Sequence, residues 1–512
     1  MRFALKYFIG IDVGTNSSKG VIIDEKCRIF ASAMEEHGVE NPRPGYFEQD
    51  ADAVWWKDVC KIAKKLTGEL GGDVKRLGGV GISALGCDVV PVDENCRPLR
   101  KAILYGIDSR ASEEMAYLTE YYGKERMDEL MGRPFNSSDC MPKILWLKNH
   151  EREVYDKAAR FLTASSFLTA KLTGEYVVDS FMASSFSPAY DKNFQIRDEI
   201  CREMYCEPRQ LARMCRTIDI AGYVTARASE ETGIPEGIPV VTGTDDSGAE
   251  AVSSGVVSPG DVMVQLGSTC YMVYCSNQLI QEPRLSCGRY LVPGTYSVDG
   301  GTNTAGNLTQ WLRDNMYQDM LEIERKGGEN AYSVLDRRAK KIPAGSDGLM
   351  VLPYFAGERV PIHDPFAKGL FFGLLLHHTR DHIYRAALEA VAYSVAQYLD
   401  ILKGHGLEVG KVIATGGGAK SETWMQIISD VTGFPVHKPE VTIGASYGDA
   451  MIAGIGAGGL SGFEYLKESI RMEKVFYPVP KHYKMYEKGK KQYEKLYENN
   501  KSMMHMASEM KA

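Results

Sequence analysis

The pattern of hydrophobic and polar positions along the chain predicts strands that alternate with helices. Apolar runs of strand length occupy residues 7–11, 19–23 and 77–83, and a run with helical spacing occupies residues 53–63. Short apolar runs bounded by turn residues are typical of buried strands, whereas apolar residues every three or four positions indicate a helix. Asp52 is the expected N-cap of that helix. The alternation continues beyond this region and predicts the α/β class.

A weak internal repeat relates two segments about 250 residues apart. Residues 7–23 and 261–274 both show an apolar strand, a turn of glycine with hydroxyl residues, and a second apolar strand. Residues 115–170 are rich in helix-forming Glu, Lys and Leu, so they are expected to form an appended helical region. The repeat predicts two similar domains, each presenting a small-residue turn to a shared cleft.

Composition and charge exclude several classes of protein. The chain has 512 residues, which exceeds the size of a single core, and 60 Lys and Arg against 67 Asp and Glu give a net charge of -7. This balance disfavours nucleic-acid and anionic-membrane partners. Eleven cysteines without a C-x-x-C pair fit neither a disulfide framework nor a zinc ribbon. With no signal-peptide or membrane-spanning pattern, a cytoplasmic protein is expected.

Two glycine turns have the composition of phosphate-binding loops. Gly14 begins the first turn and Gly267 the second, and each is followed by short polar residues. Small residues let backbone N–H groups approach a phosphate closely, although either turn alone is more often an ordinary hairpin. Asp12 either holds Mg²⁺, directly or through water, or caps its own turn. Lys19 either offers a charge to a transferring phosphoryl group or faces solvent.

Two further glycine-containing segments connect strands to helices. In residues 243–248 a carboxylate could accept a hydroxyl proton during phosphoryl transfer, or it could cap the helix that follows. Residues 416–418 are three consecutive glycines. Close packing of a strand on a helix needs one glycine, so three favour a flat ligand such as adenine against the backbone. The chain has no Walker A motif, which excludes the commonest phosphate loop.

Taken in order, these motifs resemble those of the FGGY family of carbohydrate kinases, within the actin-like ATPase fold. The resemblance runs from residue 9 to about residue 459 and depends on five segments: residues 11–15 (IDVGT), 243–246 (GTDD), 265–269 (QLGST), 357–361 (GERVP) and 416–424 (GGGAKSETW). It implies an α/β protein of two actin-like, ribonuclease H-like domains flanking a cleft. The implied parts are a sugar-binding domain (residues 1–248) and a nucleotide-binding domain (residues 249–480). Residues 481–512 are left unassigned by the resemblance; their tyrosines have helical spacing among alternating Lys and Glu, which predicts a helical tail that packs on its own domain.

The resemblance also implies roles for individual residues. Asp246 takes the position of the catalytic base, and Asp245 takes it if the register is shifted by one. Asp12 would hold Mg²⁺, while Cys87 and Asp108 would line the sugar pocket together with Asp246. The residues implied to contact ATP are Gly14, Thr15, Asn16, Lys19, Gly267, Ser268, Thr269, Gly306, Gln310, Gly418, Ala419 and Ser421.

The sugar side departs from the patterns of the named members. Xylulokinases commonly carry Met-His after the strand that ends here at Ser83, where this chain has Ala-Leu-Gly-Cys-Asp at residues 84–88. Glycerol kinases place Arg-Glu near this region, and its absence disfavours glycerol. The nucleotide end, residues 418–424, is most similar to xylulokinases.

The activity implied by the resemblance is the ATP- and Mg²⁺-dependent phosphorylation of a hydroxyl of a small sugar or polyol. A ketopentose such as xylulose is the first choice. Many family members are dimers, so the resemblance extends to a homodimer. Two alternatives are an actin-like ATPase that acts on a protein partner and a catalytically silent sugar sensor.

Overall fold

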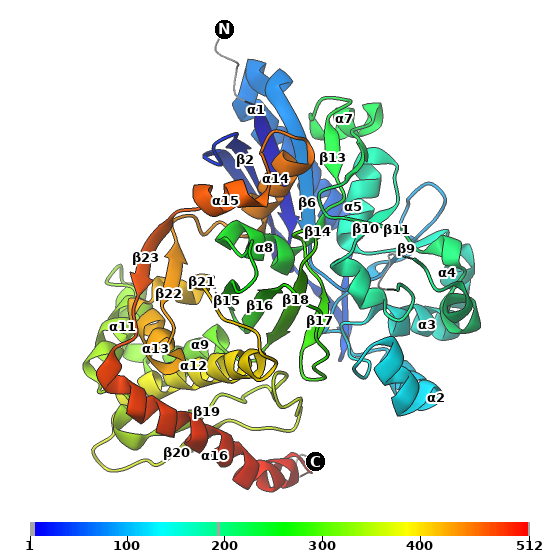
Figure 1. Cartoon of the computed structure of the whole chain (residues 1–512). Helices are drawn as coiled ribbons and strands as arrows, with labels where there is room; N and C mark the ends of the chain where they lie inside the picture. The colour runs from blue at the N-terminus through cyan, green and yellow to red at the C-terminus, as the bar shows by residue number, and fades with distance from the viewer. Residues whose placement is uncertain (1–5, 192–194, 510–512) are drawn as a thin grey trace.

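Two large mixed sheets of seven strands each form the framework of the molecule (Figure 1). The computed structural model describes residues 6–191 and 195–509, so the first five residues of the N-terminal segment and the last three of the tail lie outside it. Helix α8 (Asp246–Ser254) and helix α14 (Ala445–Gly456) lie between the two sheets. This arrangement confirms the predicted α/β class.

The first sheet has the order β12-β13-β6-β1-β2-β3, with β14 beside β6. Strands β1 and β2 form an antiparallel hairpin that places Asp12 opposite Lys19. Strand β6 runs parallel to β1, and β13 runs parallel to β6. Every residue of β1 is buried. The strands are β1 (Tyr7–Val13), β2 (Ser17–Asp24), β3 (Ile29–Glu36), β6 (Leu77–Ala84), β12 (Ile220–Tyr223), β13 (Pro239–Val241) and β14 (Thr244–Asp245).

The second sheet repeats this order as β17-β18-β16-β15-β21-β22-β23. In this sheet the β15–β16 hairpin lies beside the parallel strands β21 and β22, and the antiparallel strand β23 forms the edge. In the first sheet β6, β13 and the antiparallel edge strand β12 occupy the same places beside the β1–β2 hairpin. The predicted repeat of one hairpin therefore extends over most of each sheet. The strands are β15 (Val262–Leu266), β16 (Cys270–Ser276), β17 (Ser286–Arg289), β18 (Tyr296–Gly301), β21 (Val412–Thr415), β22 (Val436–Pro439) and β23 (Met472–Phe476).

The predicted helix over residues 53–63 has a different beginning from the one expected. Ala51–Trp56 forms a π-helical turn, and α1 (Lys57–Leu70) follows it. The N-cap is Asp50, whose side chain accepts hydrogen bonds from the N–H groups of Asp52 and Ala53. Asp52 is wrong as the cap because it already lies inside the turn, whereas Asp50 has the extended backbone that a cap requires.

The appended region over residues 115–170 is largely helical, as predicted, with one short strand inside it. It contains α2 (Ser112–Leu130), α3 (Cys140–His150), α4 (Arg152–Lys157), β9 (Arg160–Leu162) and α5 (Ala164–Thr173). The smaller strands elsewhere are β4 (Glu40–Arg43), β5 (Tyr46–Gln49), β7 (Val90–Val92), β8 (Ala102–Ile103), β10 (Val177–Asp179), β11 (Arg213–Cys215), β19 (Met350–Leu352) and β20 (Leu370–Phe372).

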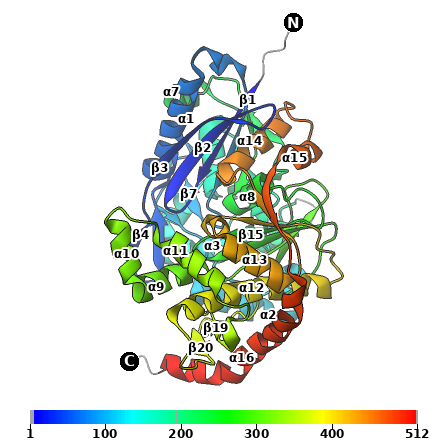
Figure 2. The ribbon, with the colours of Figure 1, turned by 90° about the vertical axis from the view of Figure 1, so that its left-hand side faces the viewer.

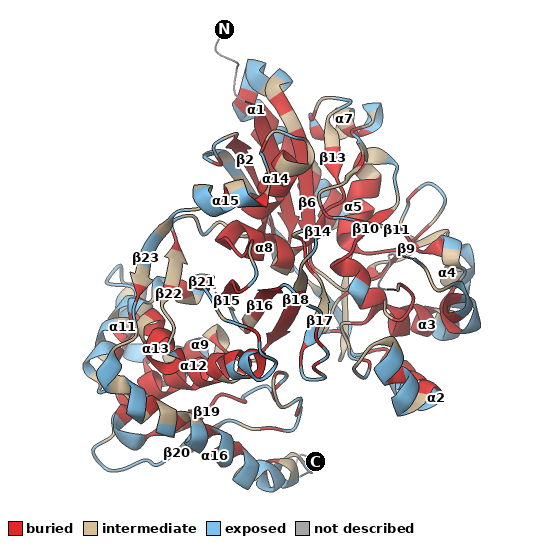
Figure 3. Cartoon of the chain, in the orientation of Figure 1, coloured by how far each residue is buried: buried red, intermediate tan, exposed pale blue. Residues whose placement is uncertain are grey.

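The remaining helices flank both halves of the molecule. Figure 2 shows the tail helix α16 crossing the base of the molecule beside α12, and Figure 3 shows that the strands between the layers are buried while α2 and α16 keep exposed outer faces. These helices are α6 (Asp198–Ile200), α7 (Ala226–Thr232), α9 (Gly306–Met316), α10 (Gln318–Arg325), α11 (Ala331–Lys341), α12 (Arg380–Gly404), α13 (Glu422–Thr432), α15 (Phe463–Ser469) and α16 (Tyr483–Glu509).

Candidate active site

The turn between β1 and β2 consists of Gly14, Thr15 and Asn16, because β1 ends at Val13 and β2 begins at Ser17. The N–H of Gly14 donates to the carbonyl of Ser17 at 3.0 Å, which closes the turn. On its outer side the hydroxyl of Thr15 lies 3.0 Å from the hydroxyl of Tyr105. The first predicted phosphate loop is therefore a tight, well-defined turn.

Asp12 belongs to a cluster of acidic side chains beside this turn. The hydroxyl of Ser83 lies 3.1 Å from Asp12 Oδ1 and 2.6 Å from Asp449 Oδ2. Burial and the charge of Asp246 raise the pKa of Asp12 to about 8, and burial and the charge of Asp12 raise the pKa of Asp449 well above its usual range. Lys19 acts in the opposite direction on Asp12. Such raised pKa values mean that the ionised forms of Asp12 and Asp449 are disfavoured here unless a positive charge compensates them.

Asp245 and Asp246 have different surroundings although they are adjacent. Asp245 is the N-cap of α8, and its Oδ1 accepts a hydrogen bond from the N–H of Gly248 at 2.7 Å. Asp246 is the first residue of the helix and is partly exposed. Burial and the charge of Glu250, one turn later, raise the pKa of Asp246 to about 6. Asp245 is therefore the residue that caps α8, and Asp246 is not.

The second hairpin turn lies against the beginning of α9. Gly267, Ser268 and Thr269 connect β15 to β16, and the N–H of Gly306 donates to the carbonyl of Gly267 at 2.9 Å. A Cβ on Gly306 would lie 2.4 Å from that carbonyl oxygen, so only glycine allows the contact. Gln310 is exposed one turn further along α9. The structure therefore brings the predicted segments 267–269 and 306–310 together.

The surroundings of the three consecutive glycines differ, and they require glycine at two of the three positions. A Cβ on Gly416 would lie 2.7 Å from the carbonyl oxygen of Leu266, and a Cβ on Gly418 would lie 2.7 Å from the Cβ of Leu266. Gly417 has open space around it. Close packing on β15 thus accounts for two glycines, where the sequence argument assigned it one.

Ala419 and Ser421 follow the glycines on the way into α13. Ala419 is buried. Ser421 caps α13 through a bond from the N–H of Trp424 at 3.0 Å, and its hydroxyl also donates to Asp336. The hydroxyl of Ser421 is therefore occupied within the protein, and its backbone is what remains for a ligand.

The loop that carries Cys87 lies against the beginning of α8. Cys87 has a φ of 66°, and its carbonyl accepts a hydrogen bond from Lys143 Nζ at 2.6 Å. Lys143 is buried, which is unusual for a lysine. A Cβ on Gly86 would lie 2.9 Å from Asp245 Oδ2. The loop that carries Cys87 is thus a neighbour of Asp245, and the grouping of Cys87 with Asp246 around a sugar stays a prediction.

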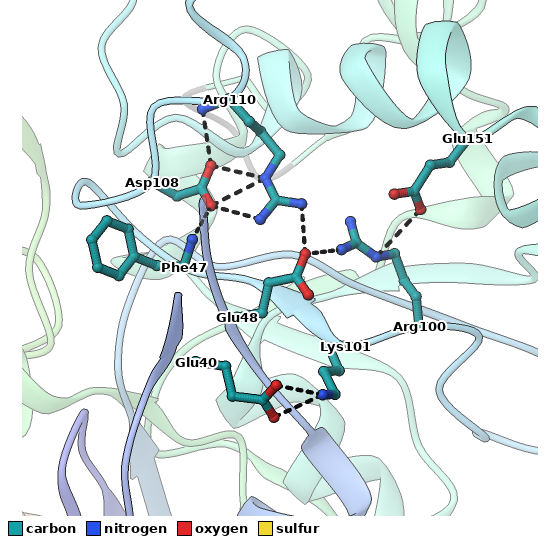
Figure 4. A network of polar contacts seen from close by, with 8 residues as sticks. All are labelled: Glu40, Phe47, Glu48, Arg100, Lys101, Asp108, Arg110 and Glu151. Atoms are coloured by element: carbon teal, nitrogen blue, oxygen red, sulfur yellow. Dashed lines mark hydrogen bonds and ion pairs between the residues drawn. The ribbon is translucent and has the colours of Figure 1, made fainter. Parts of the chain in front are cut away.

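Asp108 has a different setting from the one expected of a sugar ligand (Figure 4). Its two oxygens accept hydrogen bonds from the backbone N–H and the guanidinium of Arg110 and from the N–H of Phe47. Arg110 also donates to Glu48 at 2.9 Å. The N–H of Asp108 donates to the carbonyl of Tyr105 at 2.9 Å. Because its oxygens are fully bonded and buried, Asp108 fixes the turn that carries Tyr105 and is not free to meet a sugar.

Ser83, Glu250 and Asp449 lie in this region and are not among the predicted site residues. Ser83 and Asp449 lie in an apolar strand and in a glycine-rich helix, and their contact joins positions 366 residues apart. Glu250 could have been found, because it follows Asp246 by four residues on one face of a helix.

The acidic residues around Asp12 fit a cation that is held mainly by the phosphates of a bound nucleotide and only in part by the protein. In residues 6–191 and 195–509, no group of three or more His, Cys, Asp or Glu side chains has the geometry of a metal site. Mg²⁺ is commonly held by one or two carboxylates together with substrate phosphates and water. The buried, undercompensated carboxylate of Asp12 fits that mode of binding. Across the same described ranges, every helix is too short or too polar to cross a bilayer.

Comparisons with known proteins cover nearly the whole chain. The sequence model of the FGGY family of carbohydrate kinases matches residues 7–253 with its N-terminal domain and residues 262–457 with its C-terminal domain. A gluconokinase of Bacillus subtilis is 27% identical over 468 residues, which are 91% of this chain and 90% of that protein. A xylulose kinase of Staphylococcus epidermidis is 27% identical over 498 residues, 97% of each chain. The crystal structure of xylulose kinase from Rhodospirillum rubrum is 30% identical, with a TM-score of 0.89, and covers 98% of this chain and 100% of that one.

Proposed function

Because this chain belongs to the FGGY family of carbohydrate kinases, we propose that it transfers the γ-phosphoryl group of ATP to a hydroxyl of a small sugar with Asp246 as the catalytic base. Kinases of this family use ATP. The chain is accordingly a sugar kinase of the actin-like, two-domain fold.

The assignment of the catalytic base to Asp246 rests on the different roles of the two adjacent aspartates, Asp245 and Asp246. Asp245 accepts the capping hydrogen bond from the N–H of Gly248, whereas Asp246 is the first residue of the helix and its carboxylate does not serve as the cap. A general base needs a pKa close to the working pH, and about 6 for Asp246 suits this role. Asp246 would accept the proton of the attacking hydroxyl oxygen as that oxygen bonds to phosphorus.

The surrounding residues would bind and orient the phosphates. The two glycine turns offer backbone N–H groups, with Lys19 as a nearby positive charge. On one side the nucleotide would be bordered by Gly306 and Gln310, together with Ser268 and Thr269. The adenine base of the nucleotide would be bordered by Gly418, Ala419 and the backbone of Ser421. Asp12 would hold Mg²⁺, which when bound neutralises charge on the phosphate chain.

Replacing Asp246 by Asn tests the base directly. The Asp246→Asn variant is expected to lose at least a hundredfold in turnover, since general-base catalysis contributes about 10² to 10⁴, while nucleotide affinity stays near that of the wild type. ADP release at saturating substrate and calorimetric binding of Mg·ATP measure the two effects.

The Asp245→Asn variant is the matched control for this experiment. Asn caps a helix as well as Asp does, and its Oδ1 can still accept the hydrogen bond from the N–H of Gly248, so this variant is expected to keep both its stability and its turnover. Normal turnover in Asp246→Asn with turnover lost in Asp245→Asn would move the base to Asp245.

The charge of the acceptor region favours a neutral sugar. Burial raises the pKa values of Asp88, Asp245 and Asp246, while Lys143 is the buried cation nearby. Arg133 is already paired with Asp139 through bonds of 2.9 and 2.6 Å. An aldonic acid would add a further carboxylate to this group, whereas a ketopentose would not. This supports a neutral ketose such as xylulose over gluconate, although a gluconokinase is among the relatives.

A substrate panel tests this choice. ADP release with Mg·ATP is measured for ketopentoses, hexuloses, polyols and aldonic acids, with a control that lacks sugar. Strong stimulation by a neutral ketose supports the proposal, and stimulation by gluconate alone overturns the charge argument. Hydrolysis that no sugar increases would favour an ATPase that acts on a protein partner.

A further inference from the structure

The turn between β1 and β2 is held from behind by two side chains outside the glycine motif. His37 Nε2 lies 2.9 Å from the carbonyl oxygen of Gly14, and Gln49 Nε2 donates to the carbonyl of Thr15 at 2.8 Å. The backbone N–H of His37 donates to the carbonyl of Asn16 at 3.0 Å. Three consecutive carbonyl groups of the turn are thus fixed on one side.

Fixing these carbonyls also fixes the N–H groups of the turn. In a trans peptide the C=O and the N–H point in opposite directions, so the N–H groups of Thr15 and Asn16 are directed to the side away from His37 and Gln49. Neither N–H has a hydrogen-bond partner among the residues that the structure describes. Successive free N–H groups on one side of a turn form a concave site for an anion.

His37 is itself held in place. Its Nδ1 lies 2.8 Å from Asp58 Oδ2, and both side chains are only 7% exposed. The hydroxyl of Ser18 donates to the same oxygen at 3.0 Å. Because the carbonyl oxygen of Gly14 can only accept, the hydrogen in that contact belongs to Nε2 of His37. Asp58, near the start of α1, therefore fixes the ring that fixes the turn.

Gln49 is held in a similar way. Its Oε1 accepts a hydrogen bond from Trp55 Nε1 at 2.9 Å, so its amide nitrogen faces the turn. That nitrogen also donates to the carbonyl of Gly38 at 3.0 Å. Gln49 is almost fully buried. The turn is thus supported by two preorganised donors from separate segments, β5 and the residue after β3.

We propose that His37, oriented by Asp58, and Gln49 are positioning residues that set the affinity of this turn for the phosphate chain of a nucleotide. The inference depends on the proposed kinase function, because it assigns the anion to ATP. Neither side chain needs to touch the nucleotide. Their effect is to keep the N–H groups of Thr15 and Asn16 aimed at it.

The test uses the full-length protein and calorimetric binding of the ATP analogue AMP-PNP with Mg²⁺. His37→Leu removes the donor to Gly14, and a loss of roughly tenfold in affinity is expected, the value of one hydrogen bond of about 1.4 kcal/mol. His37→Gln keeps an amide donor of similar reach and is expected to recover most of the affinity. Turnover at saturating ATP should change much less than the KM for ATP. Gln49→Leu carries the same test if His37→Leu does not fold.

The matched control is His382→Leu. His382 is also a largely buried histidine beside an aspartate, with its Nε2 3.2 Å from Asp347 Oδ2, but it lies at the start of α12. This variant is expected to lose stability and keep its affinity for AMP-PNP. Equal affinity in wild type and His37→Leu would overturn the inference and leave the kinase function intact. No binding of AMP-PNP by the wild type would overturn the proposed function and the inference with it.

Discussion

At the scale of single residues, buried carboxylates decide the electrostatics of the acceptor region. Asp88 follows Cys87, and its Oδ1 accepts a hydrogen bond from the N–H of Ala164 at 3.1 Å. Its Oδ2 is buried without a partner among the described residues. Burial raises the pKa of Asp88 to about 7. Ionisation of Asp88 therefore destabilises the folded protein next to its candidate active site.

This destabilisation predicts a pH-dependent gain in stability for Asp88→Asn. In the unfolded chain an aspartate ionises near pH 4, so between about pH 4 and pH 7 the unfolded state releases a proton that the folded state keeps. Stability therefore falls through this window as the pH rises. Asn keeps an acceptor for Ala164 and carries no charge. Urea unfolding should show Asp88→Asn to be more stable than the wild type at pH 8, with a smaller difference at pH 5.

The exposed Asp156 provides the control for this prediction. It pairs with Arg152 on the surface of α4, and Asp156→Asn should change stability little at either pH. A gain in Asp88→Asn that is equal at pH 5 and pH 8 would show that the charge of Asp88 is not its cause.

At the scale of elements, local patterns were predictable and distant partners were not. Each phosphate hairpin is a strand, a glycine turn and a strand within one short segment, so its sequence contains the whole signal. Asp108 is different, because one of its partners, Phe47, lies 61 residues away. Its sequence context suggests a sugar ligand equally well. Only the fold shows that its oxygens are already bonded.

The tail helix α16 is an element whose packing was predicted from its tyrosine spacing. The aromatic face is buried against α12, α13 and β19, and the hydroxyl of Tyr493 lies 3.0 Å from that of Ser394 on α12. Tyr493 also meets the ring of Tyr354 edge to face, with centroids 6.3 Å apart. The solvated side of the helix carries the lysines. The helix therefore belongs to the core of its own domain.

Truncation of Tyr493 measures this contribution. Tyr493→Ala is expected to destabilise the protein by about 3 to 5 kcal/mol, because it removes a fully buried ring and leaves a cavity. Lys491→Ala, on the exposed side of the same helix, should stay within about 0.5 kcal/mol of the wild type. Equal stabilities of the two variants in urea unfolding would show that α16 does not support the core.

At the scale of the whole molecule, α8 and α14 join the two sheets. A Cβ on Gly10 of β1 would lie 2.0 Å from the carbonyl oxygen of Ser446, and a Cβ on Gly81 of β6 would lie 2.2 Å from that of Asp449. Helix α14 is thus pressed against the first sheet, although the strands before and after it belong to the second. Since α8 and α14 also carry Asp246 and Asp449, the acidic cluster lies where the two halves meet.

This position predicts that the contact between the two helices controls both stability and turnover. A Cβ on Gly448 of α14 would lie 1.9 Å from the carbonyl oxygen of Ala249 on α8. Gly448→Ala would force the helices apart at a cost of about 1 to 3 kcal/mol, typical of overpacking. It would also shift Asp449 and Asp246 relative to each other. Calorimetric melting should show the lower stability, and ADP release should show a loss of turnover larger than the loss of nucleotide affinity.

Gly68→Ala is the matched control, since Gly68 lies in α1 with open space where the Cβ would go. There the substitution should leave turnover unchanged and stabilise the helix by roughly 0.5 to 1 kcal/mol. If Gly448→Ala melted and turned over like Gly68→Ala, the helices would have room to adjust and could not act as a tight joint. If it lost stability alone, the acidic cluster would tolerate a displaced α14, and the geometry of catalysis would have to be set by α8 without its partner.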